Sequence, residues 1–196
     1  MTDQYQAFTQ SPLGKFVVKN LGLPSPAALD RFESAQPVVN GAVLLGAAPS
    51  STISASIAQI LSNIHADSYV GNNVELQQTA AKVGLNLRPL NADDKESKFK
   101  AVVFDASGIQ NSEQLKELYN FFNPIARQIS NSGRVIVIGT TPETAKTVKQ
   151  AIAQRALEGF IKSVGKEFKK GITAQVVYVD QGAEANLEST LRFLIS

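Results

Sequence analysis

Short, continuously apolar segments recur along this chain and are separated by stretches with helical spacing. The clearest ones are Ala42–Gly46, Ala101–Asp105, Arg134–Gly139 and Thr173–Val179. A strand that is apolar on both faces is typical of a parallel sheet covered by helices on both sides. Because parallel strands need crossover connections, the alternation predicts a doubly wound α/β fold. Weaker strand candidates at 68–70 and 85–90 complete a six-stranded sheet, which suits the strand order 3-2-1-4-5-6.

Helical spacing of apolar residues fills the intervals between these strands. Helices are expected at about 52–63, 74–83, 112–131 and 142–169, and in a last segment with Leu187, Leu191 and Leu194. Pro124 should kink the third of these helices. Asn111 should cap its start, with Gln114 three residues later. Gly171 should follow the end of the fourth.

Residues 1–40 differ from the rest of the chain. Residues 13–21 are expected to form a short helix that ends near Gly22, and Pro24, Pro26 and Pro37 break any longer element. We therefore expect an N-terminal arm over residues 1–40, packed on a domain that spans residues 41–196.

Composition excludes several classes of function. The net charge of +2 is too small to indicate nucleic acid or an anionic membrane as a partner. The chain has no cysteine, and its one histidine, His65, is expected to be structural or solvent-exposed, so no metal site is predicted. A secretion signal and a membrane-spanning run are both missing from the sequence, which favours a cytoplasmic protein.

The most specific pattern lies in the second half of the chain. It begins with the strand Gly133–Gly139, continues with Leu157, Gly159 and Phe160, and ends with residues 171–177. In order and spacing, these blocks resemble the short-chain dehydrogenase/reductase family over roughly residues 41–196. The resemblance implies a Rossmann-like reductase domain. It also implies a final strand after Ser196, so that residues 41–196 form a domain that lacks this strand.

The family's catalytic residues are replaced in this sequence. Where the family has Ser, Tyr and Lys, this chain has Thr140, Gln150 and Gln154. Glutamine can form hydrogen bonds but is neither an acid nor a base. The Thr140 hydroxyl can still polarise a carbonyl group, but residues 140–143 also fit a helix cap with Pro near the helix start. We expect no catalytic residues in this chain.

The loop that should bind a dinucleotide is altered in a similar way. The family has Gly-x-x-x-Gly-x-Gly after the first strand, and only Gly46 remains, with Ser50 and Thr52 at the other two glycine positions. Side chains there occupy space that the pyrophosphate requires, and Pro49 removes a backbone N–H. Gly108 persists from the family's motif after the fourth strand. The loop is either a modified phosphate loop or an ordinary strand-to-helix turn, and we expect no cofactor in this chain.

Further motifs resemble a subgroup of this family, the high-molecular-weight 3-oxoacyl-acyl-carrier-protein reductases. They are Gly14–Phe16, Leu21–Pro26, Val70–Asn73, Phe104–Ile109, Arg155–Phe160 and Glu188–Leu194. Such proteins have a degenerate first domain, often described as flavodoxin-like, followed by a complete reductase domain. The resemblance implies that the whole protein reduces 3-oxoacyl thioesters with NADPH or NADH in fatty-acid metabolism. This chain would then be a non-catalytic domain for assembly or substrate docking, with the C-terminal reductase domain as its partner and a homodimer formed through the helices at 112–131 and 142–169.

Two alternative functions of the chain remain open from the sequence. The chain is a divergent but active NAD(P)H-dependent reductase that uses Thr140 and a water or Tyr178, or it is an FMN-binding flavodoxin-like domain. Independently, one group of lysines ends the long helix: Lys162, Lys166, Lys169 and Lys170. This group is either a solvated helix face or a docking patch for an acidic partner such as acyl carrier protein.

Overall fold

The computed structural model describes residues 4–27, 29–30, 33–91 and 93–196. These residues form two compact units, residues 1–31 and residues 32–196. The first unit lies within the predicted arm, and the second contains every strand of the described chain. Within the described ranges, no helix combines the length and the apolar character that crossing a bilayer requires.

The second unit is built on a parallel sheet of six strands. They are β1 (Ala42–Ala47), β2 (Ser68–Val70), β3 (Arg88–Pro89), β4 (Phe99–Asp105), β5 (Ile129–Thr140) and β6 (Thr173–Val179). Their order is β3-β2-β1-β4-β5-β6, and all neighbouring pairs are parallel. The predicted fold class and strand order are therefore confirmed. The direction of the strand order reverses between β1 and β4, which is where ligands bind in folds of this kind.

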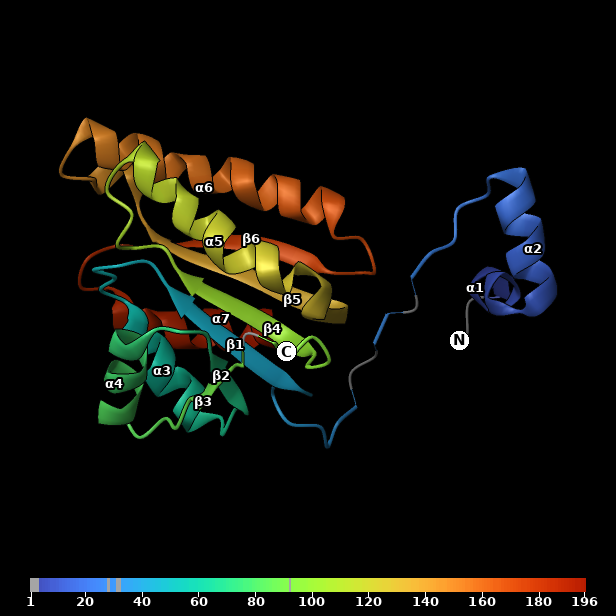
Figure 1. Ribbon diagram of the computed structural model, residues 1–196, viewed down its shortest axis with the longest axis horizontal. Helices are drawn as coiled ribbons and strands as arrows, with labels where there is room; N and C mark the ends of the chain where they lie inside the picture. Colours follow the sequence, from blue (N-terminus) through green and yellow to red (C-terminus); the bar gives the residue numbers. More distant parts are fainter. Residues whose placement is uncertain (1–3, 28, 31–32, 92) are drawn as a thin grey trace. The chain divides into compact units, whose positions relative to one another are not determined.

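Helices cover both faces of the sheet (Figure 1). One face carries α3 (Ser54–Asn63), α4 (Val74–Lys82) and α7 (Leu187–Ile195), and the other carries α5 (Lys116–Ile125) and α6 (Val148–Glu167). Short 3₁₀ turns precede α5, α6 and α7 at Ser112–Leu115, Pro142–Thr144 and Glu184–Asn186, and another follows α5 at Ala126–Gln128. These helices are the crossovers that a parallel sheet requires.

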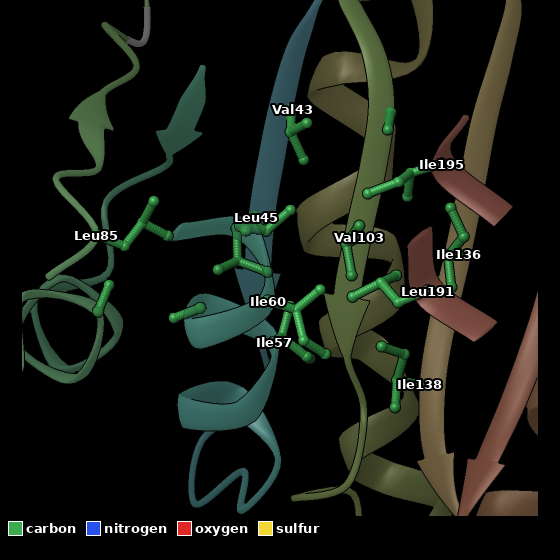
Figure 2. Packing of buried hydrophobic residues seen from close by; sticks show 14 of the residues in the cluster. Val43, Leu45, Ile57, Ile60, Leu85, Val103, Ile136, Ile138, Leu191 and Ile195 are labelled. Atoms are coloured by element: carbon green, nitrogen blue, oxygen red, sulfur yellow. The ribbon is translucent and has the colours of Figure 1, made fainter. Parts of the chain in front are cut away.

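Successive residues of the central strands enter opposite cores, because side chains of a strand alternate between its two faces. Val43 and Leu45 of β1 pack with α3, α4 and α7, whereas Leu44 between them packs with α5 and α6. Figure 2 shows the first of these cores, where Val103 and Leu191 also lie. Each of these aliphatic side chains contributes roughly 1.5–3 kcal/mol when it is fully buried. Burial on both faces explains why the strands have no polar alternation.

Two helix boundaries differ from the sequence-based expectation. The helix predicted at 112–131 ends as α5 at Ile125, one residue after Pro124, and Ile129 already begins β5. Proline has no N–H for the helical hydrogen bond, so the chain continues in a 3₁₀ turn rather than through a kink. The helix predicted at 142–169 begins later, as α6 at Val148, because Pro142–Thr144 forms a separate 3₁₀ turn. Residues 169–171 follow α6 in the left-handed region.

The first unit contains two helices, α1 (Gln4–Gln10) and α2 (Pro12–Leu21). Ser11 caps α2, and Gly22 ends it in the left-handed conformation, as predicted. Gly14 of α2 lies directly against the backbone carbonyl of Phe8, where a side-chain carbon has no room. Several large apolar side chains of this unit remain exposed, among them Leu13, Phe16 and Leu21.

Candidate functional site

The loops that follow β1 and β4 are joined at the carboxyl edge of the sheet. The Ala48 N–H and the Ser51 hydroxyl both donate to the backbone carbonyl of Asp105, at 2.8 and 2.9 Å. A Cβ on Gly108 would lie 2.1 Å from the carbonyl oxygen of Pro49. Gly108 is thus required because two backbones meet at this position. At the reversal of strand order, the backbones of the two loops are therefore in direct contact.

Asp105 is the last residue of β4, and its side chain lies at the N-terminal end of α3. Its Oδ2 accepts hydrogen bonds from the Ile53 N–H at 3.1 Å and the Ser54 hydroxyl at 2.7 Å, and its Oδ1 accepts one from the Ser107 N–H at 3.0 Å. Burial raises the pKa of this fully buried carboxyl, while the hydrogen bonds from Ser107 and Ser54 oppose that rise. An anion at a helix N-terminus is favourable, and dinucleotide folds use that place for the pyrophosphate. In this chain a carboxylate already lies there.

The predicted cofactor-loop residues lie around this carboxylate but do not form a phosphate cradle. The backbone N–H of Thr52 donates to the Ser107 hydroxyl at 2.8 Å, so this donor is already used. Ser50 is exposed and has a φ of 60°, a conformation that favours glycine. Gly46 faces α5, where a Cβ would meet the ring of Phe121 at 2.3 Å. The remaining glycine therefore has a packing reason to be glycine.

Gln154, at the family's lysine position, connects the end of β5 with the loop that follows β4. Its Oε1 accepts from the Thr140 N–H at 3.0 Å, and its Nε2 donates to the carbonyls of Ala106 and Ile109 at 2.9 and 2.8 Å. The side chain is 0% exposed. Both ends of the amide are bonded, so Gln154 is a structural group with no free donor to offer a ligand.

Gln150, at the family's tyrosine position, takes part in the cap of α6. The Thr147 hydroxyl accepts from the Gln150 N–H at 3.1 Å, and the Gln150 Oε1 accepts from the Lys146 N–H at 3.0 Å. This reciprocal arrangement is close to a capping box. The cap predicted at residues 140–143 is therefore wrong, because Pro142–Thr144 forms a separate 3₁₀ turn whose flanking Thr141 makes no side-chain cap.

A cavity of about 310 Å³ lies at the same edge of the sheet. It brings three of the predicted site residues together, since Thr52, Thr140 and Gln150 all line it, along with Ser107. Among the described residues, the Thr140 Oγ1 is one of two buried side-chain polar atoms without a hydrogen-bond partner, the other being Gln175 Oε1. A hydroxyl left unpaired at this position is a group that could bind a water or a ligand.

Tyr178 does not supply a proton donor to this cavity. Its hydroxyl donates to the backbone carbonyl of Gln154 at 2.8 Å, on the α6 side of β6. Burial, together with the negative charge of nearby Glu158, raises the pKa of Tyr178 to about 12. A phenol that is this weakly acidic is poorly matched to proton transfer near neutral pH.

The remaining predicted positions lie apart from this edge. Lys162, Lys166, Lys169 and Lys170 are all exposed. His65 is exposed at the end of α3 with a φ of 53°. Within the part of the chain that is described, no three histidine or acidic side chains are grouped as a metal site requires.

Two structural features of the site were not predicted from the sequence. The cap at Thr147 has a local signal, because Thr147 and Gln150 have the Thr-x-x-Gln spacing that precedes helices. The role of Asp105 has no local signal, since the groups that it caps are 51 and 52 residues away along the chain.

Comparison with solved structures identifies the fold class. A short-chain dehydrogenase/reductase from Serratia marcescens aligns with 82% of this chain and 92% of its own, with a TM-score of 0.56 and 13% identity. BdcA from E. coli aligns with 79% of this chain and 90% of its own (TM-score 0.50, 19% identity). BdcA in complex with NADPH covers 78% of both chains (TM-score 0.52, 18% identity). The chain therefore has the Rossmann-like fold of short-chain dehydrogenase/reductases.

At these identities the likeness concerns the fold alone. The sequence itself matches no protein-family model and no curated protein.

Proposed function

We propose that this chain is a non-catalytic domain with a short-chain reductase fold, which supports assembly or substrate docking for a reductase domain absent from this chain. The whole cytoplasmic protein would reduce 3-oxoacyl thioesters with NADPH or NADH, as the sequence resemblance implies. The observation that carries the proposal is the Asp105 carboxylate at the start of α3. A pyrophosphate would have to displace this anion and its buried hydrogen bonds, which is unfavourable for both charge and desolvation.

The two glutamines support the same proposal. Gln154 and Gln150 are used for loop bridging and helix capping, and neither can exchange a proton with a substrate. The positions that perform chemistry elsewhere in this fold therefore contribute to stability in this chain.

Calorimetric titration of the folded chain with NADH, NADPH and FMN tests the proposal. An active short-chain reductase under the same conditions serves as the positive control. We expect no heat of binding at ligand concentrations up to about 1 mM, which corresponds to less than about 4 kcal/mol of binding free energy. Micromolar binding of a nicotinamide cofactor would overturn the proposal, and binding of FMN would favour a flavodoxin-like function.

Self-association is part of the proposed assembly role. α5 and α6 expose Tyr119, Val148 and Ile152, which are 66%, 76% and 60% accessible to solvent. Exposed apolar side chains on neighbouring helices favour a protein–protein contact. Light scattering behind size exclusion should show a dimer, and Ile152→Glu with Val148→Glu should convert it to a monomer. A monomeric parent chain would contradict this part of the proposal.

Docking of acyl carrier protein is the second part of that role. The four lysines at 162, 166, 169 and 170 extend from the last turns of α6 into the loop that follows. An acidic carrier protein should bind them with an affinity that falls as salt increases. Changing all four residues to Glu should weaken binding at least tenfold in a titration followed by NMR. If the carrier protein binds the parent chain and the four-lysine variant equally well, the lysines form a solvated helix face and not a docking patch.

A divergent active reductase is the second candidate function. The unpaired Thr140 hydroxyl beside the 310 Å³ cavity favours it, as does the likeness of the fold to BdcA, which has been solved with NADPH. NADPH oxidation in the presence of acetoacetyl-CoA would then be lost in Thr140→Val. A parent chain without measurable turnover would exclude this candidate.

A further inference from the structure

A second, larger cavity of the second unit lies beside the loop that follows β1. It has a volume of about 610 Å³ and is formed between β1, the start of α4, the segment after β3, and α5. Cavities of 300–1,000 Å³ are the size that binds drug-sized molecules. The cavity shares no lining residue with the smaller one beside Thr140.

The cavity owes its shape to one glycine and to an aromatic cluster. Phe121 of α5 lies against Gly46 and packs at a tilt against Phe104, with ring centroids 4.9 Å apart. Leu44 and Leu90 add aliphatic surface to the same lining. Because the absent side chain of Gly46 makes room for the Phe121 ring, the apolar wall is fixed by packing rather than by a mobile loop.

The charged side chains at the rim are mostly acidic. Glu75, Asp94 and Glu117 lie along the lining, and Lys95 is the one cationic side chain among the described residues there. Asp94 is held in place, because its Oδ1 accepts from the backbone N–H groups of Glu96 and Ser97, both at 2.9 Å. Three carboxylates against one ammonium repel an anion and attract a cation.

The side of the cavity that faces the start of α3 offers no place for a phosphate. The space beside Ala48, Ser51 and Ser54 amounts to only about 20 Å³, which is room for little more than one water molecule. Asn73, between the two spaces, is also engaged, since its side-chain oxygen caps α4 by accepting from the Leu76 N–H at 2.9 Å.

We propose that this cavity binds a small apolar amine, a ligand with a hydrophobic body, a single positive charge and no phosphate. The body would lie on Phe121, Phe104 and Leu44, and the ammonium would lie at the rim near Glu75 and Glu117. The inference is independent of the proposed assembly role, because it requires only the apolar wall, the acidic rim and the blocked phosphate position.

Three probes with the same naphthalene body but different charges test which charge of ligand the cavity prefers. They are 2-naphthylmethylammonium, 2-naphthalenemethanol and 2-naphthoate, titrated into the full chain and followed by NMR. We expect the ammonium to bind about tenfold more tightly than the alcohol, and the carboxylate to bind more weakly than both. Amide resonances of Gly46, Gly71 and Leu90 should shift.

Two sets of variants separate this cavity from other apolar surfaces. Gly71 lines the cavity, and a Cβ there meets no atom within 4 Å, so Gly71→Phe should fill the space without strain. Gly159→Phe on the surface of α6 is the matched control, because its Cβ position is equally open. The double variant Glu75→Gln with Glu117→Gln should abolish the preference for the ammonium and leave binding of the alcohol unchanged. Glu167→Gln with Glu188→Gln should alter neither.

Three results would overturn the proposal. They are naphthoate binding as tightly as the ammonium, probe binding that is unchanged in Gly71→Phe, and no shift with any probe up to about 1 mM. Because the resonance shifts locate the site in the parent chain, the test holds even where Gly71→Phe does not fold.

Discussion

The side-chain oxygen of Gln154 accepts a hydrogen bond from the backbone N–H of Thr140 at 3.0 Å. These residues lie at the positions where the family resemblance expects a catalytic lysine and serine. Both stand at the carboxyl edge, on α6 and at the end of β5, as that resemblance implies. The contact between them is a structural bond of a buried amide rather than part of a proton relay.

Removing the Gln154 amide should destabilise the protein strongly. Gln154→Leu leaves the Thr140 N–H and the carbonyls of Ala106 and Ile109 without their partner, so the free energy of unfolding should fall by about 3 kcal/mol. Urea denaturation measures the change. Gln59→Leu, on the exposed face of α3, is the control and should alter stability by less than about 0.5 kcal/mol. Similar losses in both variants would contradict the bridging role.

The cap of α6 predicts a smaller effect. Thr147→Ala removes the acceptor of the Gln150 N–H and should lower the free energy of unfolding by about 1 kcal/mol. Ser163→Ala, in the exposed middle of α6, should change it by less than about 0.5 kcal/mol. The cap assignment fails if thermal unfolding of Thr147→Ala matches that of the parent chain.

The close approach of the loops after β1 and β4 predicts that adding one methyl group at Gly108 lowers stability. Gly108→Ala places its Cβ 2.1 Å from the Pro49 carbonyl oxygen and should cost about 1–3 kcal/mol of stability. Gly159→Ala, in an open position of α6, should raise stability by up to about 1 kcal/mol because alanine favours the helix. Chemical denaturation of both variants gives the comparison. A neutral Gly108→Ala would mean that the loops separate at little cost.

Burial of Asp105 predicts a specific pH dependence. Because its folded pKa is raised, Asp105 binds its proton more tightly in the folded protein than in the unfolded chain, and its contribution to stability is largest below the unfolded pKa of about 3.9. This contribution is lost as pH rises through the folded pKa. The stability of the parent chain minus that of Asp105→Asn should therefore decrease with pH over that window. A difference that grows with pH would show that the hydrogen bonds from α3 outweigh desolvation.

Restoring the family's catalytic residues should not restore activity. The triple variant Thr140→Ser, Gln150→Tyr and Gln154→Lys leaves the Asp105 carboxylate at the start of α3, so the cofactor remains excluded. We expect no NADPH oxidation with acetoacetyl-CoA above that of the parent chain, in a sample whose circular dichroism shows it to be folded. Measurable turnover would mean that the altered residues, and not the loop, are what prevents catalysis.

Much of the fold could be predicted from local sequence. Apolar runs such as Val43–Leu45 and Val135–Ile138 are continuous because both faces of the strands are buried, and the resulting strand order is the predicted one. The caps at Gly22 and Asn111 follow from residue type and spacing, and both are observed. The early end of α5 at Ile125 was not predicted, because the outcome at Pro124 depends on where the chain must turn into β5.

The sequence by itself determined which groups could not act, since a glutamine at positions 150 and 154 excludes acid–base chemistry wherever it lies. Only the tertiary structure decided what these groups do instead. Gln154 meets the carbonyl of Ala106 across 48 residues, and Asp105 meets Ser54 across 51. Contacts at such separations depend on how the strands are ordered and how closely their loops approach, and no local propensity encodes them. For this reason, the carboxylate of the last residue of β4 lies at the start of α3.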